Sequence, residues 1–230
     1  MFDAKDQAYI NGKPNKSNAG KVIFGLTGGQ KGSAVSWSVP GNMVINYMAC
    51  HDNNTLWDKL AISNVDDSEE ARLAMNRLGI SVIMIGRGVP FFLAGEEMLR
   101  SKQGNHNSYN ASDKVNNIDW EVLQKNSPEM EMRDFYKALI AMRKANSFLT
   151  QAEVTCEILE DNVIRVEYQM DGKTVGIAFI NPNDAAVDCP LPEGSWGVLI
   201  DGTDVFTTPS GTKTGAAAVP AKGVLLVTAP

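Results

Sequence analysis

Two patterns of apolar and polar positions divide the chain near residue 151. After that point apolar and polar side chains alternate, most clearly over residues 164–170. A period of two predicts half-buried strands, and the dipeptide Asp171-Gly172 is a strong hairpin-turn signal. Further short apolar runs, separated by Pro, Gly and Asn, follow at residues 175–179, 186–189, 197–200, 205–207 and 223–227. The sequence therefore predicts a small antiparallel β-domain of the sandwich type over residues 151–230.

Helical periodicity dominates residues 1–150, after a loop-rich stretch over residues 1–42 with one short helix near residues 18–26. In the helix predicted after Asp66, Asp67 is the expected N-cap, because Glu70 follows three residues later. Its apolar face is expected to comprise Ala71, Ala74, Met75, Leu78, Val82 and Ile85. Ser127-Pro128 predicts the start of another helix. The buried stripe of that helix is expected to comprise Met132, Phe135, Tyr136, Leu139 and Met142.

Two short apolar runs, residues 43–48 and 89–94, interrupt the helical half. Continuous apolar runs of this length are typical of strands that are buried on both faces, as in a parallel sheet. Functional sites lie at the carboxyl ends of such strands. His51 and Asp52 follow the first run, and both side chains can face one small polar ligand. The alternative interpretation is that Asp52 only caps the segment that follows.

A second polar cluster, Glu96 and Glu97, follows the other apolar run. Adjacent residues of a strand point to opposite faces, so these two carboxylates cannot both address one scissile bond. Glu97 is therefore interpreted as structural, tying loops together, and Glu96 is left without an assigned role.

Composition narrows the range of partners. The 230 residues carry a net charge of -6, with a pI near 5.0, which argues against nucleic acid or an anionic membrane surface as the main partner. No apolar run approaches the length of a membrane span.

Three widely spaced cysteines match neither a zinc pattern nor a disulfide framework and favour a reducing, cytoplasmic setting, although an export signal would lie outside this fragment. No cofactor is predicted, and a structural calcium ion is left open without support from the sequence.

The wording of three segments carries a resemblance to a known family. Residues 45–60, INYMACHDNNTLWDKL, resemble the fourth conserved region of the α-amylase superfamily of glycoside hydrolases, and in particular its debranching branch, the type I pullulanases. The pattern GxPxxxxGxE over residues 88–97 resembles the region at the eighth barrel strand. NSYNASDKVNNIDW, residues 107–120, is similar to the loop that lines the sugar groove in pullulanases.

This resemblance implies roles for individual residues. It implies that His51 binds the sugar at the cleavage point and that Asp52 stabilises the oxocarbenium-like transition state. Five further residues are implied to contact substrate: Asn53, Trp57, Tyr109, Asp113 and Asn117. The family often has Arg at the position of Asn117, so the role of that residue stays open.

The resemblance also implies that the chain is only part of an enzyme. In the family, the nucleophile and the general acid come from the fourth and fifth barrel strands, and neither region is in this sequence. Only two buried parallel strands are predicted, against the eight of a barrel. The expected fold is α/β: the carboxyl-terminal part of a (β/α)8 TIM barrel over residues 1–150, with strands 7 and 8, followed by the β-sandwich over residues 151–230. Such a fragment is expected to be inactive alone.

The implied partner is an α-glucan, namely pullulan, starch or glycogen branches. A second expected partner is the missing amino-terminal part of the barrel, or another copy of the chain that covers exposed apolar surface. Two alternatives remain: a glycogen-branching or isoamylase-type relative, and a non-catalytic carbohydrate-binding or structural module. Against the second, residues 151–230 offer only Trp196 and Tyr168 as stacking platforms, and Tyr168 is on the apolar face of its strand.

Overall fold

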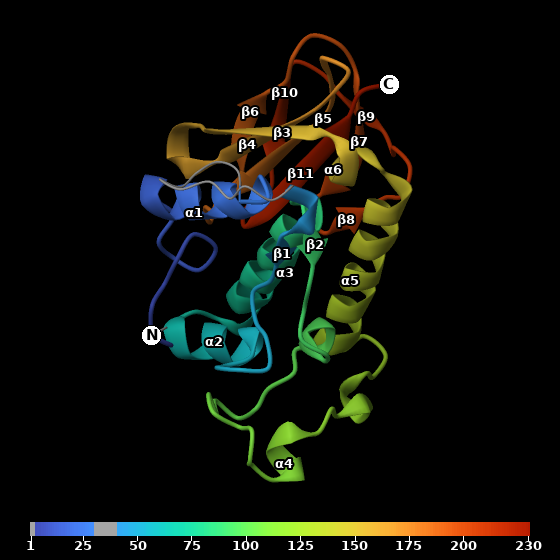
Figure 1. The fold of residues 1–230 in the computed structure, drawn as a ribbon. Helices are drawn as coiled ribbons and strands as arrows, with labels where there is room; N and C mark the ends of the chain where they lie inside the picture. The colour runs from blue at the N-terminus through green and yellow to red at the C-terminus, as the bar shows by residue number, and fades with distance from the viewer. Residues whose placement is uncertain (1–2, 30–40) are drawn as a thin grey trace.

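The computed structural model describes residues 3–29 and 41–230, and it combines helices with one parallel strand pair and antiparallel sheets (Figure 1). The helices are α1 Lys16–Leu26, α2 Leu56–Ser63, α3 Glu69–Ile85, α4 Asp113–Asn116, α5 Pro128–Ala145 and α6 Phe148–Gln151. The strands are β1 Ile45–Asn46, β2 Val89–Pro90, β3 Glu153–Ile158, β4 Ile164–Met170, β5 Lys173–Asn181, β6 Val187–Pro190, β7 Trp196–Asp201, β8 Asp204–Val205, β9 Thr212–Lys213, β10 Ala216–Val219 and β11 Gly223–Thr228. Single 3-10 turns lie at Gly41–Met43, Glu96–Met98, Trp120–Val122 and Glu160–Asn162.

The three predicted helices are present, with one wrong cap. Ser127 caps α5 as expected, and the whole predicted stripe of α5 is buried. The N-cap of α3 is Ser68 rather than Asp67, because the Ser68 hydroxyl accepts the Ala71 N–H at 3.2 Å. The prediction of a single apolar face on α3 is also wrong. Side chains are buried around most of the helix, including the polar Asn76 and Ser81, because α3 packs against α1, α2, α5 and the sheet.

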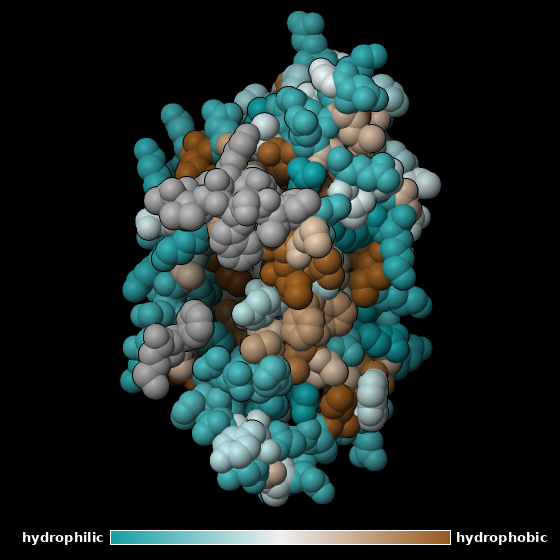
Figure 2. All heavy atoms as spheres, viewed as in Figure 1, coloured by the Kyte–Doolittle hydropathy of each residue, from teal (hydrophilic) through white to brown (hydrophobic). Residues whose placement is uncertain are grey.

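Strands β1 and β2 form a parallel pair, in which Val89 N–H donates to Val44 O at 2.7 Å and Phe91 N–H donates to Asn46 O at 2.9 Å. The expectation that residues 43–48 are buried on both faces is wrong. Val44 is buried, whereas the neighbouring side chains of the pair are exposed: Met43, Ile45, Tyr47, Val89 and Phe91. The reason is that, in the described part of the chain, no other element packs on the second face of this two-stranded sheet. Figure 2 shows these hydrophobic residues gathered in the middle of one side of the molecule.

The seven-stranded sheet, in the order β3-β4-β5-β11-β7-β8 with β9 beside β7, is covered on both faces. Ala178 and Ile180 of β5 pack into the core shared with α1, α3 and α5. Ile177 and Phe179 point the other way, into a second core that includes residues of the β6–β10 pair. The predicted hairpin is confirmed, because Asp171 and Gly172, both with positive φ, join β4 to β5. Strands β3, β9 and β10 were not predicted.

The turn between α3 and β2 is held from both halves of the chain. The buried Arg143 guanidinium of α5 donates to three carbonyls of this turn: Met84 O at 2.6 Å, Gly86 O at 2.8 Å and Gly88 O at 2.8 Å. The Tyr168 hydroxyl of β4 donates to Ile85 O at 2.8 Å. Since β2 starts directly after this turn, the hydrogen bonds from Arg143 and Tyr168 fix the start of β2 relative to α5 and β4.

Neither proposed stacking platform of the β-rich half is available to a sugar. Tyr168 is fully buried, and Trp196 is buried with its indole N–H donating to Pro192 O at 3.1 Å. Within residues 3–29 and 41–230, none of the helices has the length and apolar character needed to cross a membrane.

Candidate active site

The loop after β1 presents His51 and Asp52 to solvent. Their side chains are 84% and 75% exposed, and His51 Nε2 lies 3.5 Å from Asp52 Oδ2. Asp52 does not cap the helix that follows, since Thr55 does so: its hydroxyl accepts the Asp58 N–H at 3.2 Å. The capping interpretation of Asp52 is therefore wrong for α2. The pair lies on an irregular loop at the carboxyl end of a parallel strand, free to contact a ligand.

The other two residues predicted near this pair differ in their surroundings. Asn53 is exposed and has a φ of 63°, a left-handed conformation that asparagine adopts more readily than most residues. Trp57 lies in the first turn of α2 and is only half-buried, with its ring against the helical core. Asn53 thus extends the exposed polar surface beside Asp52, whereas Trp57 has a clear packing role.

The loop after β2 carries the remaining predicted residues. Tyr109 is 84% exposed. Asp113 begins the single-turn helix α4 and Asn117 ends it, with the Asn117 N–H donating to Asp113 O at 2.7 Å. Both are exposed and therefore available to a ligand. Among the described residues, no hydrogen bond or ion pair joins these three side chains directly to His51 or Asp52.

Two side chains, one at the end of the first loop and one in α2, nevertheless bind the loop after β2, and sequence reasoning missed both. Asn54 Nδ2 donates to Gly104 O at 3.0 Å. The buried Asp58 carboxylate accepts the Ser101 hydroxyl at 2.6 Å and the Lys102 N–H at 2.7 Å. A lone acidic residue in the first turn of a helix usually complements the helix dipole, so nothing local marks Asp58 as a bridge between loops.

Glu96 and Glu97 have separate structural environments. Glu97 Oε2 accepts the Gly95 N–H at 2.9 Å, which places this carboxylate within its own turn. Glu96 is 4% exposed and accepts the Tyr136 hydroxyl at 3.1 Å, while Tyr136 also lies 3.3 Å from Asn76 Oδ1. Burial raises the pKa of Glu96 to about 7, against the opposing effect of the Tyr136 hydrogen bond. Glu96 is therefore an internal acid that anchors the start of the loop after β2.

The titration of Glu96 predicts how stability depends on pH. A carboxyl whose folded pKa is raised stabilises the fold fully below its unfolded pKa of 4.5, and this stabilisation is lost as the pH rises to about 7. The Glu96→Gln variant removes this titration. We expect it to abolish about 3 kcal/mol of the pH-dependent loss of unfolding free energy between these two pH values. Urea unfolding at several pH values measures this, with exposed Glu121→Gln as control. An unchanged pH profile in Glu96→Gln would contradict the assignment.

A metal has no evident site in the described part of the chain. No group of three or more His, Cys, Asp or Glu side chains within residues 3–29 and 41–230 is arranged to hold one. The expectation that no cofactor is needed stays a prediction.

Known proteins share the sequence and fold of much of this chain. No protein-family model matches the chain. The pullulanase of Bacillus subtilis strain 168 is 30% identical over 166 residues, which cover 68% of this chain and 23% of that protein. An isoamylase of a Flavobacterium species is also 30% identical over 166 residues, covering 61% of this chain and 21% of its own length. The matched part of the chain thus spans less than a quarter of the length of each of these two relatives.

Solved structures extend the likeness over nearly the whole chain. A pullulanase from Bacillus acidopullulyticus superposes with a TM-score of 0.87 at 30% identity, covering 99% of this chain and 28% of that one. The type I pullulanase of Bacillus subtilis strain 168, complexed with maltose, gives a TM-score of 0.85 at 25% identity, covering 98% of this chain and 33% of that one. The mixed helix and sheet arrangement described above is therefore that of the matching region in these proteins.

Proposed function

In sequence and in fold this chain resembles the carboxyl-terminal part of type I pullulanases, and we propose that it works as one part of a retaining glycoside hydrolase that cleaves α-1,6-glucosidic branch linkages. The substrate class is an α-glucan, such as pullulan or the branches of starch and glycogen. The likeness to an isoamylase supports the broader assignment to debranching enzymes. The observation that carries the proposal is the exposed His51–Asp52 pair at the carboxyl end of β1, parallel to β2.

The proposed roles follow from chemistry and exposure. Asp52 is a carboxylate that can stabilise positive charge at the anomeric carbon of a distorted sugar, and His51 can hydrogen-bond a hydroxyl of the same sugar. Asn53 adds an exposed amide beside them. On the loop after β2, Tyr109 offers a stacking surface, while Asp113 and Asn117 offer hydrogen-bonding groups to a neighbouring glucose.

The architecture that we propose is a partial barrel with an all-β second half. β1 and β2 correspond in this proposal to strands 7 and 8 of a (β/α)8 barrel within residues 1–150, and residues 151–230 form a β-sandwich. Support comes from the parallel β1–β2 pair and from the β6–β10 pair, which covers one face of the large sheet.

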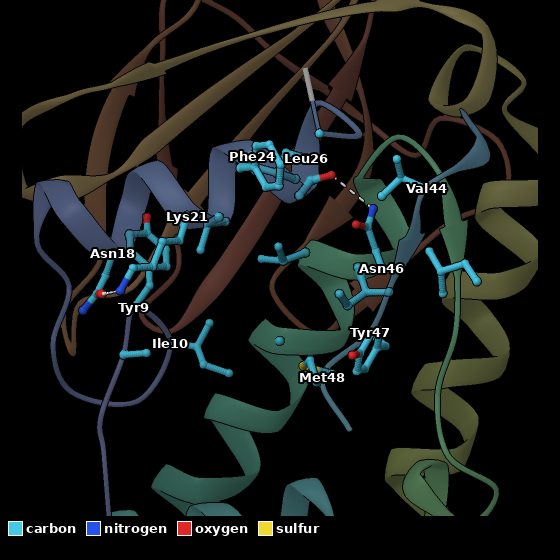
Figure 3. A pocket seen from close by; sticks show the side chains of 18 residues that line it. Tyr9, Ile10, Asn18, Lys21, Phe24, Leu26, Val44, Asn46, Tyr47 and Met48 are labelled. Carbon is cyan, nitrogen blue, oxygen red and sulfur yellow. Dashed lines mark hydrogen bonds between the residues drawn. The ribbon is translucent and has the colours of Figure 1, made fainter. Parts of the chain in front are cut away.

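The edge of β1 opposite β2, which pairs with no strand within residues 3–29 and 41–230, is the proposed contact with the rest of the barrel. The carbonyls of Val44 and Asn46 bond to β2, so the peptide groups of Ile45 and Tyr47 face the opposite edge. Beside that edge is a largely apolar cavity of about 420 Å³, lined by α1, β1 and α3 (Figure 3). Among the lining residues, Asn46 Nδ2 donates a hydrogen bond to Gly25 O at 3.1 Å and so links β1 to α1. An added parallel strand with apolar side chains would fit both the edge and the cavity.

Residues 1–230 alone are expected to release no maltotriose from pullulan. A retaining glycosidase needs two carboxyl groups about 5 Å apart on either side of the bond, and the proposal places both outside this chain. The measurement is reducing-sugar release by the purified chain, with Bacillus subtilis pullulanase as positive control. Hydrolysis that disappears in Asp52→Ala would show that this chain carries its own nucleophile and acid.

A further inference from the structure

The proposed groove is built from two loops that must keep a fixed relation to each other. One follows β1 and carries His51 and Asp52, and the other follows β2 and carries Tyr109 and Asp113. We propose that Asp58 is a positioning residue that fixes these two loops against each other, so that the two sides of the groove are set as one unit. This inference rests on the proposed function, because it assigns Asp58 a role in that groove.

The buried carboxylate of Asp58 uses both of its oxygens to bind the second loop. It is 5% exposed, and both of its carboxylate oxygens accept hydrogen bonds from the opposite loop, one from the Ser101 hydroxyl and one from the Lys102 N–H. Hydrogen bonds to a buried carboxylate are stronger than those between neutral groups. Asp58 itself is on α2, three residues after its N-cap Thr55. A displacement of the second loop relative to α2, the helix that follows the first loop, must therefore break a charge-assisted contact.

The connection continues from Asp58 to the far end of the second loop. Lys102 is buried, and its ammonium donates to the Ser108 hydroxyl at 2.9 Å. Ser108 O in turn accepts Asn116 Nδ2 at 2.7 Å. Asn116 is in α4, the helix that Asp113 begins, and its carbonyl accepts a hydrogen bond from Arg100 Nη2. A continuous chain of polar contacts thus links Asp58 to the turn that presents Asp113.

A second hydrogen bond joins the two loops close to Asp52. The Asn54 amide, two residues after Asp52, donates to Gly104 O at 3.0 Å. Asn54 and Asp58 therefore hold residues 101–104 from two positions that flank the start of α2. With two attachment points, the second loop can neither slide nor rotate against the first without losing at least one bond.

The two histidines of the chain provide one probe on each loop, His51 on the first and His106 on the second. The experiment is a proton–carbon correlation spectrum of the full chain with ¹³C-labelled histidine, in which His106→Gln assigns the two imidazole signals. Ser101→Ala removes a donor to Asp58 from the second loop. We expect it to shift or broaden the His51 signal by more than a line width, although Ser101 is distant from His51 in sequence. Asp58→Asn is expected to do the same to both signals.

Controls separate positioning from general stabilisation. Glu121→Gln changes an exposed carboxylate that makes no side-chain hydrogen bond or ion pair with the described residues, and it is expected to leave the His51 signal in place. Ser101→Thr keeps the hydroxyl and should restore it. A His51 signal that stays unchanged in folded Ser101→Ala overturns the inference, even if the melting temperature falls. Should Asp58→Asn not fold, Ser101→Ala and Asn54→Ala decide the question. The experiment does not measure hydrolysis. A negative result would therefore overturn only the positioning role of Asp58 and would leave the proposed glycosidase function untouched.

Discussion

Replacing Asp52 by asparagine is expected to lower kcat on pullulan by about a hundredfold or more, once the chain is completed to an active barrel. Removal of one group that stabilises transition-state charge typically costs about 10²–10³ in kcat. The variant keeps the size of the side chain but removes its negative charge. The Asp52 side chain is exposed and pairs with the likewise exposed His51 at 3.5 Å. We therefore expect the fold to be unaffected.

The measurement needs a protein that contains the barrel segments that we propose to lie outside this chain. A chimera in which this chain replaces the matching region of Bacillus subtilis pullulanase provides one, with the unsubstituted chimera as reference. Asp66→Asn is a matched control, since Asp66 is an exposed acid beyond α2 whose side chain makes no hydrogen bond or ion pair with the described residues. If Asp52→Asn keeps kcat within a few-fold of the reference, Asp52 has no part in transition-state stabilisation.

Replacing Arg143 by methionine is expected to lower the free energy of unfolding by about 3 kcal/mol or more. The guanidinium is buried, and burial lowers its pKa, yet it donates to three carbonyls of the α3–β2 turn. Methionine fills part of the space but leaves those carbonyls without a donor, at about 1–3 kcal/mol for each buried group left unpaired. Arg143→Lys should be intermediate, because an ammonium cannot reproduce the fork of the guanidinium.

Urea or thermal unfolding of the 230-residue chain measures this effect. Lys144→Met is the matched control, since Lys144 is the next residue of α5 and is exposed. We expect it to change stability by less than about 0.5 kcal/mol. Equal effects of Arg143→Met and Lys144→Met would mean that the three carbonyl contacts contribute nothing to stability.

Features with a local cause were predictable from the sequence. The β4–β5 hairpin follows from Asp171-Gly172, which takes positive φ, and α5 follows from its Ser-Pro start and its apolar stripe. The cap of α3 was misplaced by one residue, because Asp67 and Ser68 are both good N-caps and the sequence does not rank them. The loop position of His51-Asp52 was also predictable, since a polar cluster directly followed an apolar run.

Features that depend on distant parts of the chain were not predictable. Met43 and Tyr47 are exposed because no other element of the described chain packs on their face of the β1–β2 pair. Asp58 meets Ser101 across 43 residues of sequence, and Glu96 meets Tyr136 across 40. No periodicity or motif encodes such pairs, because each arises only when helices and loops have packed. The roles of Asp52, Asp113 and the other implied site residues remain predictions from the family resemblance.

The Tyr168 hydroxyl bond to Ile85 O has a consequence for the order in which the protein matures. During synthesis, β2 leaves the ribosome before β4 does, so the α3–β2 turn is made well before the tyrosine that completes it. Arg143 is also translated after β2. The hydrogen bond from Tyr168 to Ile85 O can therefore form only after β4 has been synthesised. Premature termination near residue 160 would consequently leave the end of α3, just before β2, without this bond.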